Sequence, residues 1–292
     1  MIVALIHEVF HGAGGGERLR SVLREARAGG AELALLPELP LDAWVATGRV
    51  ARDADAEEPN GPRQRRMADA AREAGVALLG GAIVRDPTTG RRFNRALLFD
   101  AAGTPIAAYD KCHLPSEEGY FESDHYEPGQ DPPRRIDGLP LALGIQICSD
   151  VNRPEGSQLL SADGAEVIAV PRATPAESYG QWRLVLRANA LTGCVWVLSP
   201  NRPRPEPGVA IGGPSLAVAP DGEVLLESSA RVAFVRLERD ALSRARRDYP
   251  GYLARRRELY ARGWSRLARE AGAGGVERDA GGPAASPSPR GD

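Results

Sequence analysis

Three ionisable side chains of different types stand at the ends of apolar runs that predict buried strands. Glu38, Lys111 and Cys148 each lie at the carboxyl end of such a run. A cysteine thiolate is a nucleophile, a half-buried carboxylate has a pKa raised toward that of a base, and a lysine can stabilise an oxyanion. Because the carboxyl ends of neighbouring strands meet at one sheet edge, the three residues together predict a site for thiol-dependent acyl transfer.

Cys148 carries the nucleophile hypothesis. It is followed by Ser149 and Asp150, and a helix is expected to begin near Pro154. A turn between a strand and a helix exposes a side chain and directs backbone N–H groups and the helix dipole at it, which lowers the pKa of a thiol. The alternative is that Cys148 is a small core residue, as we expect for Cys194, which opens an apolar strand.

Other common kinds of site find less support in the sequence. In the glycine run at 11–17, Gly12 and Gly14 fit a dinucleotide-binding loop, but Glu17 occupies the position of the third glycine. We therefore expect a flexible loop between a strand and a helix, and keep nucleotide binding as an alternative. The four histidines lack metal-ligand spacing and no Gly-x-Ser-x-Gly is present, so we expect neither a metal site nor a serine nucleophile.

The composition is typical of a globular enzyme. Hydrophobic residues make up 42% and charged residues 26% of the 292 residues, and the formal net charge is -2. This balance argues against a nucleic-acid partner, which usually requires a basic excess. No apolar stretch approaches the ~18 residues of a membrane span, and the short apolar start predicts a strand rather than a signal peptide. Three cysteines are too few for a disulfide framework and indicate reduced thiols, and hence a cytoplasmic protein.

The elements that would position these residues alternate between strands and helices at both ends of the chain. We expect strands at 2–7, 32–39, 76–84, 91–100, 103–110, 139–148, 166–173, 194–200, 212–220, 223–228 and 230–238, and helices at 16–30, 62–75, 154–165, 178–193 and 240–271, the last broken at Pro250. Consecutive strands in the middle favour two packed sheets with helices outside over a single doubly wound sheet.

Two further segments have no regular pattern. The irregular stretch at 111–133 is long enough that we expect it to be functional. Residues 272–292 consist mainly of Gly, Ala, Pro and Ser, with almost no side chains that could form a core. We therefore predict one domain at 1–271, followed by a disordered tail at 272–292.

Three segments together carry a resemblance to a known family. LLPELPL around Glu38, YDKCHLP around Lys111 and GIQICSDVNRPE around Cys148 resemble the signature segments of the nitrilase (carbon-nitrogen hydrolase) superfamily. Their order and the gaps of 73 and then 37 residues between the three residues also match. The resemblance extends over residues 1–265 and includes the YEPG turn at 126–129.

The resemblance implies a fold and a mechanism. Members have a four-layer α-β-β-α sandwich of the α/β class, and a Glu-Lys-Cys triad hydrolyses non-peptide carbon–nitrogen bonds through a thioester, without a metal or an organic cofactor. It also implies a homodimer or larger homo-oligomer in which the sandwich faces that carry the cysteine meet. Many members have a second, assisting glutamate after the lysine. Glu122 is the best match to it, and Glu117 and Glu118 are rivals.

The departures from the family bear on the substrate. Ser149 stands where most members carry an aromatic residue, and Asp150 stands where nitrile-hydrolysing members carry glutamate. We therefore expect a small linear amide or carbamoyl substrate rather than a nitrile. Ser149 and Asp150 are assigned to substrate binding, with the Ser149 N–H and Lys111 holding the oxyanion. A nitrilase, or a non-catalytic or nucleotide-binding relative with the same fold, is the alternative.

Arg172 is a third candidate for substrate binding. It follows the next strand after the one that bears Cys148, so its side chain leaves a neighbouring carboxyl end. An arginine there suits bidentate capture of a substrate carboxylate. The alternative is that Arg172 pairs with Asp150 or Glu155 and only supports the loop.

Overall fold

The structure is a computed structural model that describes residues 1–273. Its compact first unit, Met1–Tyr252, ends before the predicted domain boundary at 271, and a second unit begins at Leu253. The second unit contains the helix α6 (Arg257–Ala273). The predicted disordered tail at 272–292 lies outside the described residues, apart from its first two residues, which close α6.

Two main sheets form the first unit. The first has the strand order β13-β1-β2-β3-β4-β5, with bounds Val232–Arg236, Ile2–Ile6, Leu33–Leu35, Ala77–Arg85, Arg92–Phe99 and Pro105–Asp110. The second has the order β12-β11-β10-β9-β8, with bounds Val224–Ser228, Ser215–Val218, Trp196–Ser199, Val167–Ala169 and Leu143–Ile145. Strands β1, β2 and β3 are parallel, as are β8, β9 and β10, so within each set the carboxyl ends share one edge.

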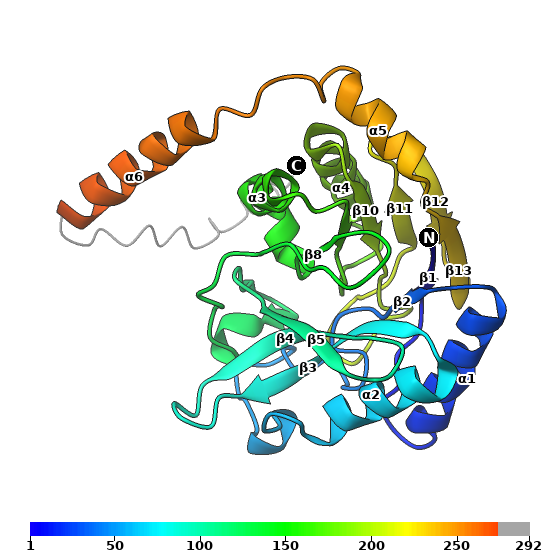
Figure 1. The fold of residues 1–292 in the computed structure, drawn as a ribbon. Coiled ribbons are helices and arrows are strands. Elements are labelled where there is room, and N and C mark those ends of the chain that lie inside the picture. The colour runs from blue at the N-terminus through cyan, green and yellow to red at the C-terminus, as the bar shows by residue number, and fades with distance from the viewer. Residues whose placement is uncertain (274–292) are drawn as a thin grey trace, which may run out of the picture. The chain divides into compact units, whose positions relative to one another are not determined.

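Helices cover the outer faces of both sheets (Figure 1). Helices α1 and α2 pack on the first sheet, and α3 and α4 pack on the second. Their bounds are Gly15–Ala28, Pro62–Ala74, Pro154–Asp163 and Tyr179–Gly193. The inner faces pack on each other through side chains that include Leu35, Leu79, Ile145 and Leu198. The α-β-β-α sandwich implied by the resemblance is therefore confirmed.

Strand β1 shows why its sequence is apolar throughout. Val3 and Leu5 face the second sheet, whereas Ala4 and Ile6 lie beneath the helices. A strand buried on both faces does not alternate between apolar and polar residues, and so forms a continuous apolar run. Each fully buried aliphatic side chain of this kind contributes about 1.5–3 kcal/mol to folding.

The glycine run between β1 and α1 is a tight connection. A Cβ on Gly15 would lie 1.8 Å from the Phe10 carbonyl oxygen, so only glycine fits where the helix begins. Arg18 donates to the carbonyl oxygens of His11 and Ala13, which turns these backbone acceptors toward its guanidinium. This arrangement favours the predicted structural loop over a phosphate-binding loop.

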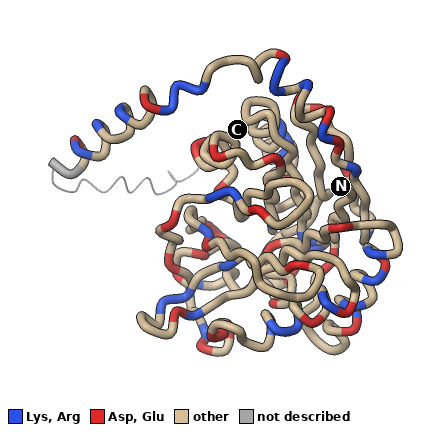
Figure 2. The backbone as a smooth tube through the Cα atoms, viewed as in Figure 1, with Lys and Arg blue, Asp and Glu red and all other residues tan. Residues whose placement is uncertain are grey.

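Several predicted strands are shorter in the structure; those predicted at 32–39, 139–148 and 166–173 cover only Leu33–Leu35, Leu143–Ile145 and Val167–Ala169. The break predicted at Pro250 is confirmed, because the chain is not helical over 248–256, between α5 (Arg239–Arg247) and α6. None of the helices within residues 1–273 combines the length and apolarity that a bilayer crossing requires. Acidic and basic residues are interspersed along the backbone of the first unit (Figure 2).

The irregular stretch at 111–133 contains short ordered elements. A small hairpin joins β6 (Ser116–Glu117) to β7 (Tyr120–Phe121), and a 3-10 turn covers Glu122–Asp124. The amide of Phe121 donates to the Ala46 carbonyl at 2.8 Å, which ties the hairpin to the body of the fold.

Candidate active site

The predicted triad residues follow strands of both sheets. Glu38 lies three residues after β2, Lys111 directly after β5, and Cys148 three residues after β8, at the start of the 3-10 turn Cys148–Asn152. Since β2 and β5 belong to the first sheet and β8 to the second, the site lies between the two layers. All three side chains are buried, with 5% or less of each residue exposed.

Lys111 is enclosed by two carboxylates. Its Nζ donates to Glu38 Oε1 at 2.8 Å and to both oxygens of Glu122, at 2.8 and 2.6 Å. Burial alone would lower the pKa of Lys111, but the charges of Glu122 and Glu38 hold it well above its usual value. Lys111 therefore stays protonated and acts as a fixed cation rather than as a base.

Glu122, and not its rivals, is the second glutamate at this site. Glu117 and Glu118 are exposed on the hairpin, whereas only 1% of Glu122 is exposed. Burial raises the pKa of Glu122 above its usual range, against the opposing effect of Lys111. The 3-10 turn that follows the hairpin therefore supplies a second buried carboxylate that accepts hydrogen bonds from Lys111.

Two residues that sequence reasoning missed hold Glu38. Asn94 on β4 donates its side-chain amide to Glu38 Oε1 at 2.8 Å. Buried Arg202 donates to the carbonyl oxygens of Glu38 and Leu39 at 3.0 and 2.7 Å, and it pairs with Glu206. Leu39 has a φ of 45°, so these bonds hold a strained backbone. The sequence signal available for Asn94 was a neutral polar residue in a predicted strand, next to the apolar run at 96–99.

Cys148 lies on a strained turn and its thiol is not activated by a helix. Its φ is 45°, and its amide donates to the Pro171 carbonyl at 2.9 Å. Burial raises the pKa of the Cys148 thiol well above its usual value, and the charge of Glu38 raises it further. Helix α3 begins at Pro154 as predicted, but the prediction that its dipole lowers this pKa is wrong, because burial and the charge of Glu38 outweigh it. Cys148 is a neutral thiol at rest and requires a base.

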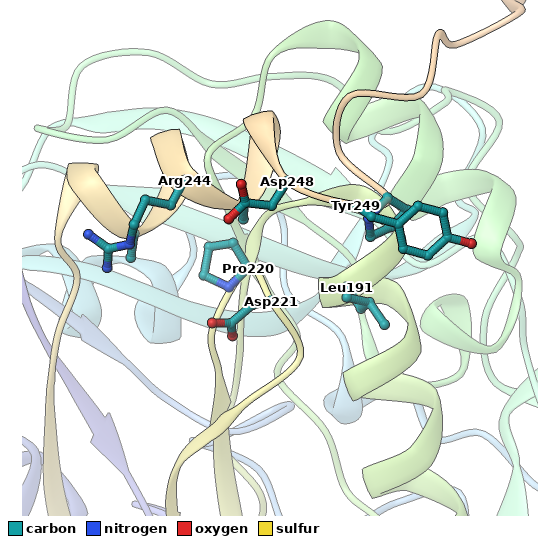
Figure 3. A pocket seen from close by; sticks show the side chains of 9 residues that line it. Leu191, Pro220, Asp221, Arg244, Asp248 and Tyr249 are labelled. Carbon is teal, nitrogen blue, oxygen red and sulfur yellow. The ribbon is translucent and has the colours of Figure 1, made fainter.

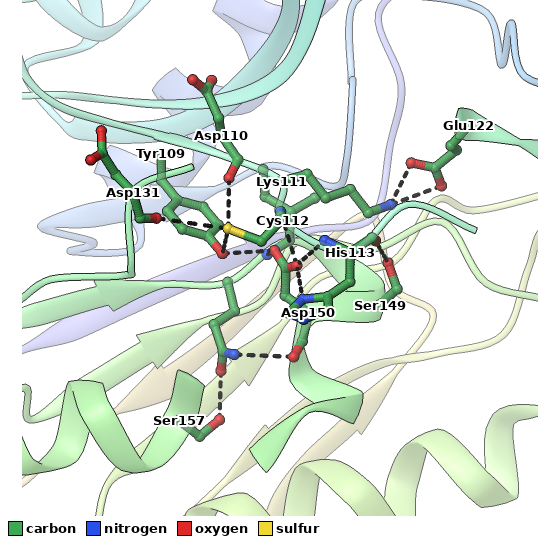
Figure 4. A network of polar contacts seen from close by, with 12 residues as sticks. Tyr109, Asp110, Lys111, Cys112, His113, Glu122, Asp131, Ser149, Asp150 and Ser157 are labelled. Carbon is green, nitrogen blue, oxygen red and sulfur yellow. Dashed lines mark hydrogen bonds and ion pairs between the residues drawn. The ribbon is translucent and has the colours of Figure 1, made fainter. Parts of the chain in front are cut away.

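Asp150 joins the cysteine turn to the lysine segment (Figure 4). Its Oδ1 accepts the backbone amides of Cys112 and His113 at 3.1 and 2.8 Å. Its Oδ2 accepts the Tyr109 hydroxyl at 2.9 Å and the Ile147 amide at 3.1 Å. Only 1% of the residue is exposed. These contacts favour a positioning role for Asp150 over the predicted contact with substrate.

Ser149 is held next to the cysteine by a hydrogen bond from its hydroxyl to the His113 carbonyl oxygen. Its backbone amide belongs to the first turn of the 3-10 segment, where N–H groups have no partner within the helix. This position suits the predicted oxyanion contact from the backbone, while the side chain serves the loop.

Arg172 is fully buried, and its guanidinium donates to three neutral oxygens and lies 5.7 Å from the centre of the Tyr179 ring. It donates through Nε to Ser199 Oγ at 2.9 Å, through Nη1 to Thr174 Oγ1 at 2.6 Å, and through Nη2 to the Pro214 carbonyl. The alternative of an ion pair with Asp150 or Glu155 is wrong for this structure, because all its bonds go elsewhere within residues 1–273. Burial lowers the pKa of Arg172 to about 10, so it remains charged at neutral pH.

A hollow beneath α5 lies away from these residues (Figure 3). Its volume is about 100 Å³, and Leu191, Pro220, Arg244 and Tyr249 are among the residues that line it. This volume is below the ~300–1,000 Å³ of most ligand pockets, and none of the triad residues lines the hollow. Within residues 1–273, no three His, Cys, Asp or Glu side chains are grouped so that they could bind a metal ion.

Comparisons with known proteins point to one family. A family model described as Carbon-nitrogen hydrolase matches residues 12–246. The chain is 32% identical over 254 residues to "Hydrolase in pqqF 5'region" of Pseudomonas protegens, covering 85% of each chain. It is 28% identical to omega-amidase NIT2 of Homo sapiens, covering 84% of this chain and 90% of that protein. It is 26% identical to N-carbamoylputrescine amidase of Arabidopsis thaliana, covering 82% and 86%.

A solved structure extends the similarity to the fold. The crystal structure of an amidase from Nesterenkonia sp. has a TM-score of 0.74 and 26% identity, and the match covers 90% of this chain and 96% of that one. A structure of a mutant amidase from Nesterenkonia sp. AN1, 25% identical with a TM-score of 0.72, carries acrylamide added to its active-site cysteine.

Proposed function

The chain belongs to the carbon-nitrogen hydrolase family, and from this premise we propose that it is a cysteine-dependent amidase acting on linear amide or carbamoyl compounds. The observation that carries the proposal is the fully buried Lys111, held by Glu38 and Glu122 within electrostatic range of Cys148. A buried lysine between two carboxylates costs desolvation energy that a purely structural site rarely bears. Relatives named amidases support the same reaction class.

Acylation begins with the resting thiol. Glu38 removes the proton of Cys148, whose sulfur attacks the carbonyl carbon of the substrate. Lys111 Nζ and the Ser149 N–H bind the oxyanion of the tetrahedral intermediate. The proton held by Glu38 passes to the leaving nitrogen as the carbon–nitrogen bond breaks, and ammonia or an amine departs from the thioester.

Deacylation uses the same groups in reverse. Glu38 takes a proton from water, and the resulting hydroxide attacks the thioester carbon. The carbon–sulfur bond breaks, the carboxylic acid departs, and the sulfur recovers its proton from Glu38. Glu122 keeps Lys111 charged and oriented through both steps, because its two oxygens accept hydrogen bonds from Nζ.

The substrate class is tested by ammonia release from three panels: primary amides, N-carbamoyl amino acids and nitriles. We expect turnover of a primary amide or a carbamoyl compound and a slower or undetectable reaction with nitriles. Exclusive turnover of nitriles would replace the amidase proposal with a nitrilase. No turnover in any panel would favour the non-catalytic alternative.

Arg172 provides a test of carboxylate recognition. Each of its guanidinium nitrogens already donates to a protein oxygen, so we expect a structural role. Arg172→Ala should lower the free energy of unfolding by about 2–4 kcal/mol, because it leaves buried acceptors without donors. KM should change equally for an amide with a free carboxylate and for its neutral analogue. A rise in KM confined to the acidic substrate would restore the predicted carboxylate fork.

The assembly and location remain proposals. We propose a homodimer or larger homo-oligomer, with the outer face of the second sheet as the contact region. Leu159 on α3 and Leu184 on α4 support this, because they are 52% and 68% exposed. Light scattering of the purified protein would show a monomer if the proposal is wrong. We also propose a cytoplasmic location, because three cysteines are too few for a disulfide framework and indicate reduced thiols.

A further inference from the structure

Three of the seven buried polar atoms that lack a hydrogen-bond partner within residues 1–273 belong to Glu38 and to two tyrosines that pack in the cluster containing its neighbour Leu39. These atoms are Glu38 Oε2, Tyr120 Oη and Tyr126 Oη. Buried polar groups in native proteins are nearly always hydrogen-bonded, so a group of unsatisfied atoms at one place indicates the position of a polar ligand. Which of the three atoms serve the substrate depends on where each one lies relative to Glu38 and Glu122.

Glu38 uses only one of its two carboxylate oxygens for protein contacts. Lys111 Nζ and Asn94 Nδ2 both donate to Oε1 at 2.8 Å. The buried oxygen Oε2 is thus the one available to take the thiol proton and to face the leaving nitrogen. It accepts hydrogen bonds, so its natural partner is a substrate N–H.

Tyr120 presents its hydroxyl to the same place from the hairpin. Its ring packs edge-on against Trp44, with ring centroids 5.7 Å apart, and Trp44 Nε1 donates to the Gly119 carbonyl at 2.9 Å. The ring also packs on a hydrophobic cluster that contains Leu39 and Ala173. Leu39 directly follows the base Glu38 in the chain. Two contacts thus fix the ring while its hydroxyl has no partner.

The two tyrosines, Tyr120 and Tyr126, differ in the residues that surround them. Tyr120 packs on the cluster that contains Leu39 and Ala173. Burial raises the pKa of its hydroxyl, and the charges of Cys148 and Glu38 raise it further. Burial also raises the pKa of Tyr126, followed by the charges of Glu122 and Glu38. The amide of Tyr126 donates to the Glu122 carbonyl at 2.9 Å, so Tyr126 lies beside Glu122.

We propose that Tyr120 Oη and Glu38 Oε2 together bind the leaving –NH₂ group of the substrate, which makes the enzyme selective for unsubstituted amides that release ammonia. This inference rests on the proposed amidase function. During acylation the sulfur–carbon bond forms and the carbon–nitrogen bond breaks. The thiol proton moves through Glu38 Oε2 to the nitrogen. Tyr120 Oη accepts a hydrogen bond from one N–H group of this nitrogen until ammonia leaves.

The test compares two reactions of one acyl group. Tyr120→Phe should lower kcat/KM for butyramide by about tenfold or more, the scale of one lost hydrogen bond to the reacting group. It should leave kcat for 4-nitrophenyl butyrate unchanged, because that leaving group has no N–H and hydrolysis of the shared thioester limits this reaction. The preference of the wild-type enzyme for butyramide over N-methylbutyramide should narrow in the variant.

Tyr126→Phe is the matched control. It removes an equally buried hydroxyl on the Glu122 side, so the ratio of amide to ester turnover should stay at the wild-type value. Equal losses with amide and ester in Tyr120→Phe would show that Tyr120 only supports the fold. Wild-type rates with both substrates would also overturn the inference. If the wild-type enzyme hydrolyses the ester but no primary amide, the proposed function and this inference both fall.

Discussion

Replacing Cys148 with alanine should abolish hydrolysis of every amide substrate, a loss of about 8 kcal/mol or more of transition-state stabilisation. The thioester route has no substitute for the sulfur, and Glu38 alone would have to activate water against an intact amide. The loss should appear in kcat measured by ammonia release. Intact-mass spectrometry of the wild-type protein during turnover should show an acyl group on Cys148.

The other two cysteines provide matched controls. Cys112 is half-buried and accepts the Tyr109 hydroxyl at 3.4 Å, while only its backbone amide reaches Asp150. Cys194 is buried at the end of α4. Cys112→Ala and Cys194→Ala should therefore retain most of the activity. Substantial hydrolysis by the Cys148→Ala protein would exclude covalent catalysis at this residue.

The sequence was most informative where a local pattern determines the outcome. Strand ends are local features, so the apolar runs before Glu38, Lys111 and Cys148 predicted their places at sheet edges. The layered arrangement required more than periodicity, because nothing in a strand identifies the sheet it joins. The signature segments provided that information by resemblance.

The sequence was least informative where partners come from distant segments. Glu122 could not be separated from Glu117 or Glu118, because only the pairing of β6 with β7 buries one and exposes the others. The pKa of Cys148 depends on burial and on Glu38, which is 110 residues away in the chain. The local helix signal therefore predicted the wrong direction of the shift.

Asp150 and Arg172 show the same limitation for polar residues. Both follow strand ends, which made substrate contact a reasonable prediction from their positions. Their hydrogen bonds instead go to segments that only the packed sheets bring close, such as the Lys111 loop for Asp150 and Ser199 for Arg172. A charged residue near a site can serve either the substrate or the scaffold, and the distinction depends on its bonds.

The second large effect is expected for Lys111→Arg, which keeps the charge. Lys111 is the only lysine in the sequence, and every other basic residue among the 37 Lys and Arg is arginine. A chain that uses arginine everywhere else has a compact ammonium at this one position. Its Nζ lies within 2.8 Å of oxygens from both Glu38 and Glu122, and the side chain is 0% exposed. A planar guanidinium is larger and directs its donors in a fixed fork.

Arginine at this position should therefore displace one glutamate and withdraw the donor from the oxyanion. We expect kcat to fall by about 100-fold or more, which is the scale of one lost oxyanion donor. Lys111→Met, which removes the charge at similar length, should lose at least as much activity, because two buried carboxylates would lack their counter-charge. Circular dichroism should confirm that both variants are folded before their kinetics are compared. Near wild-type turnover by Lys111→Arg would mean that a positive charge alone suffices and that Nζ does not contact the oxyanion.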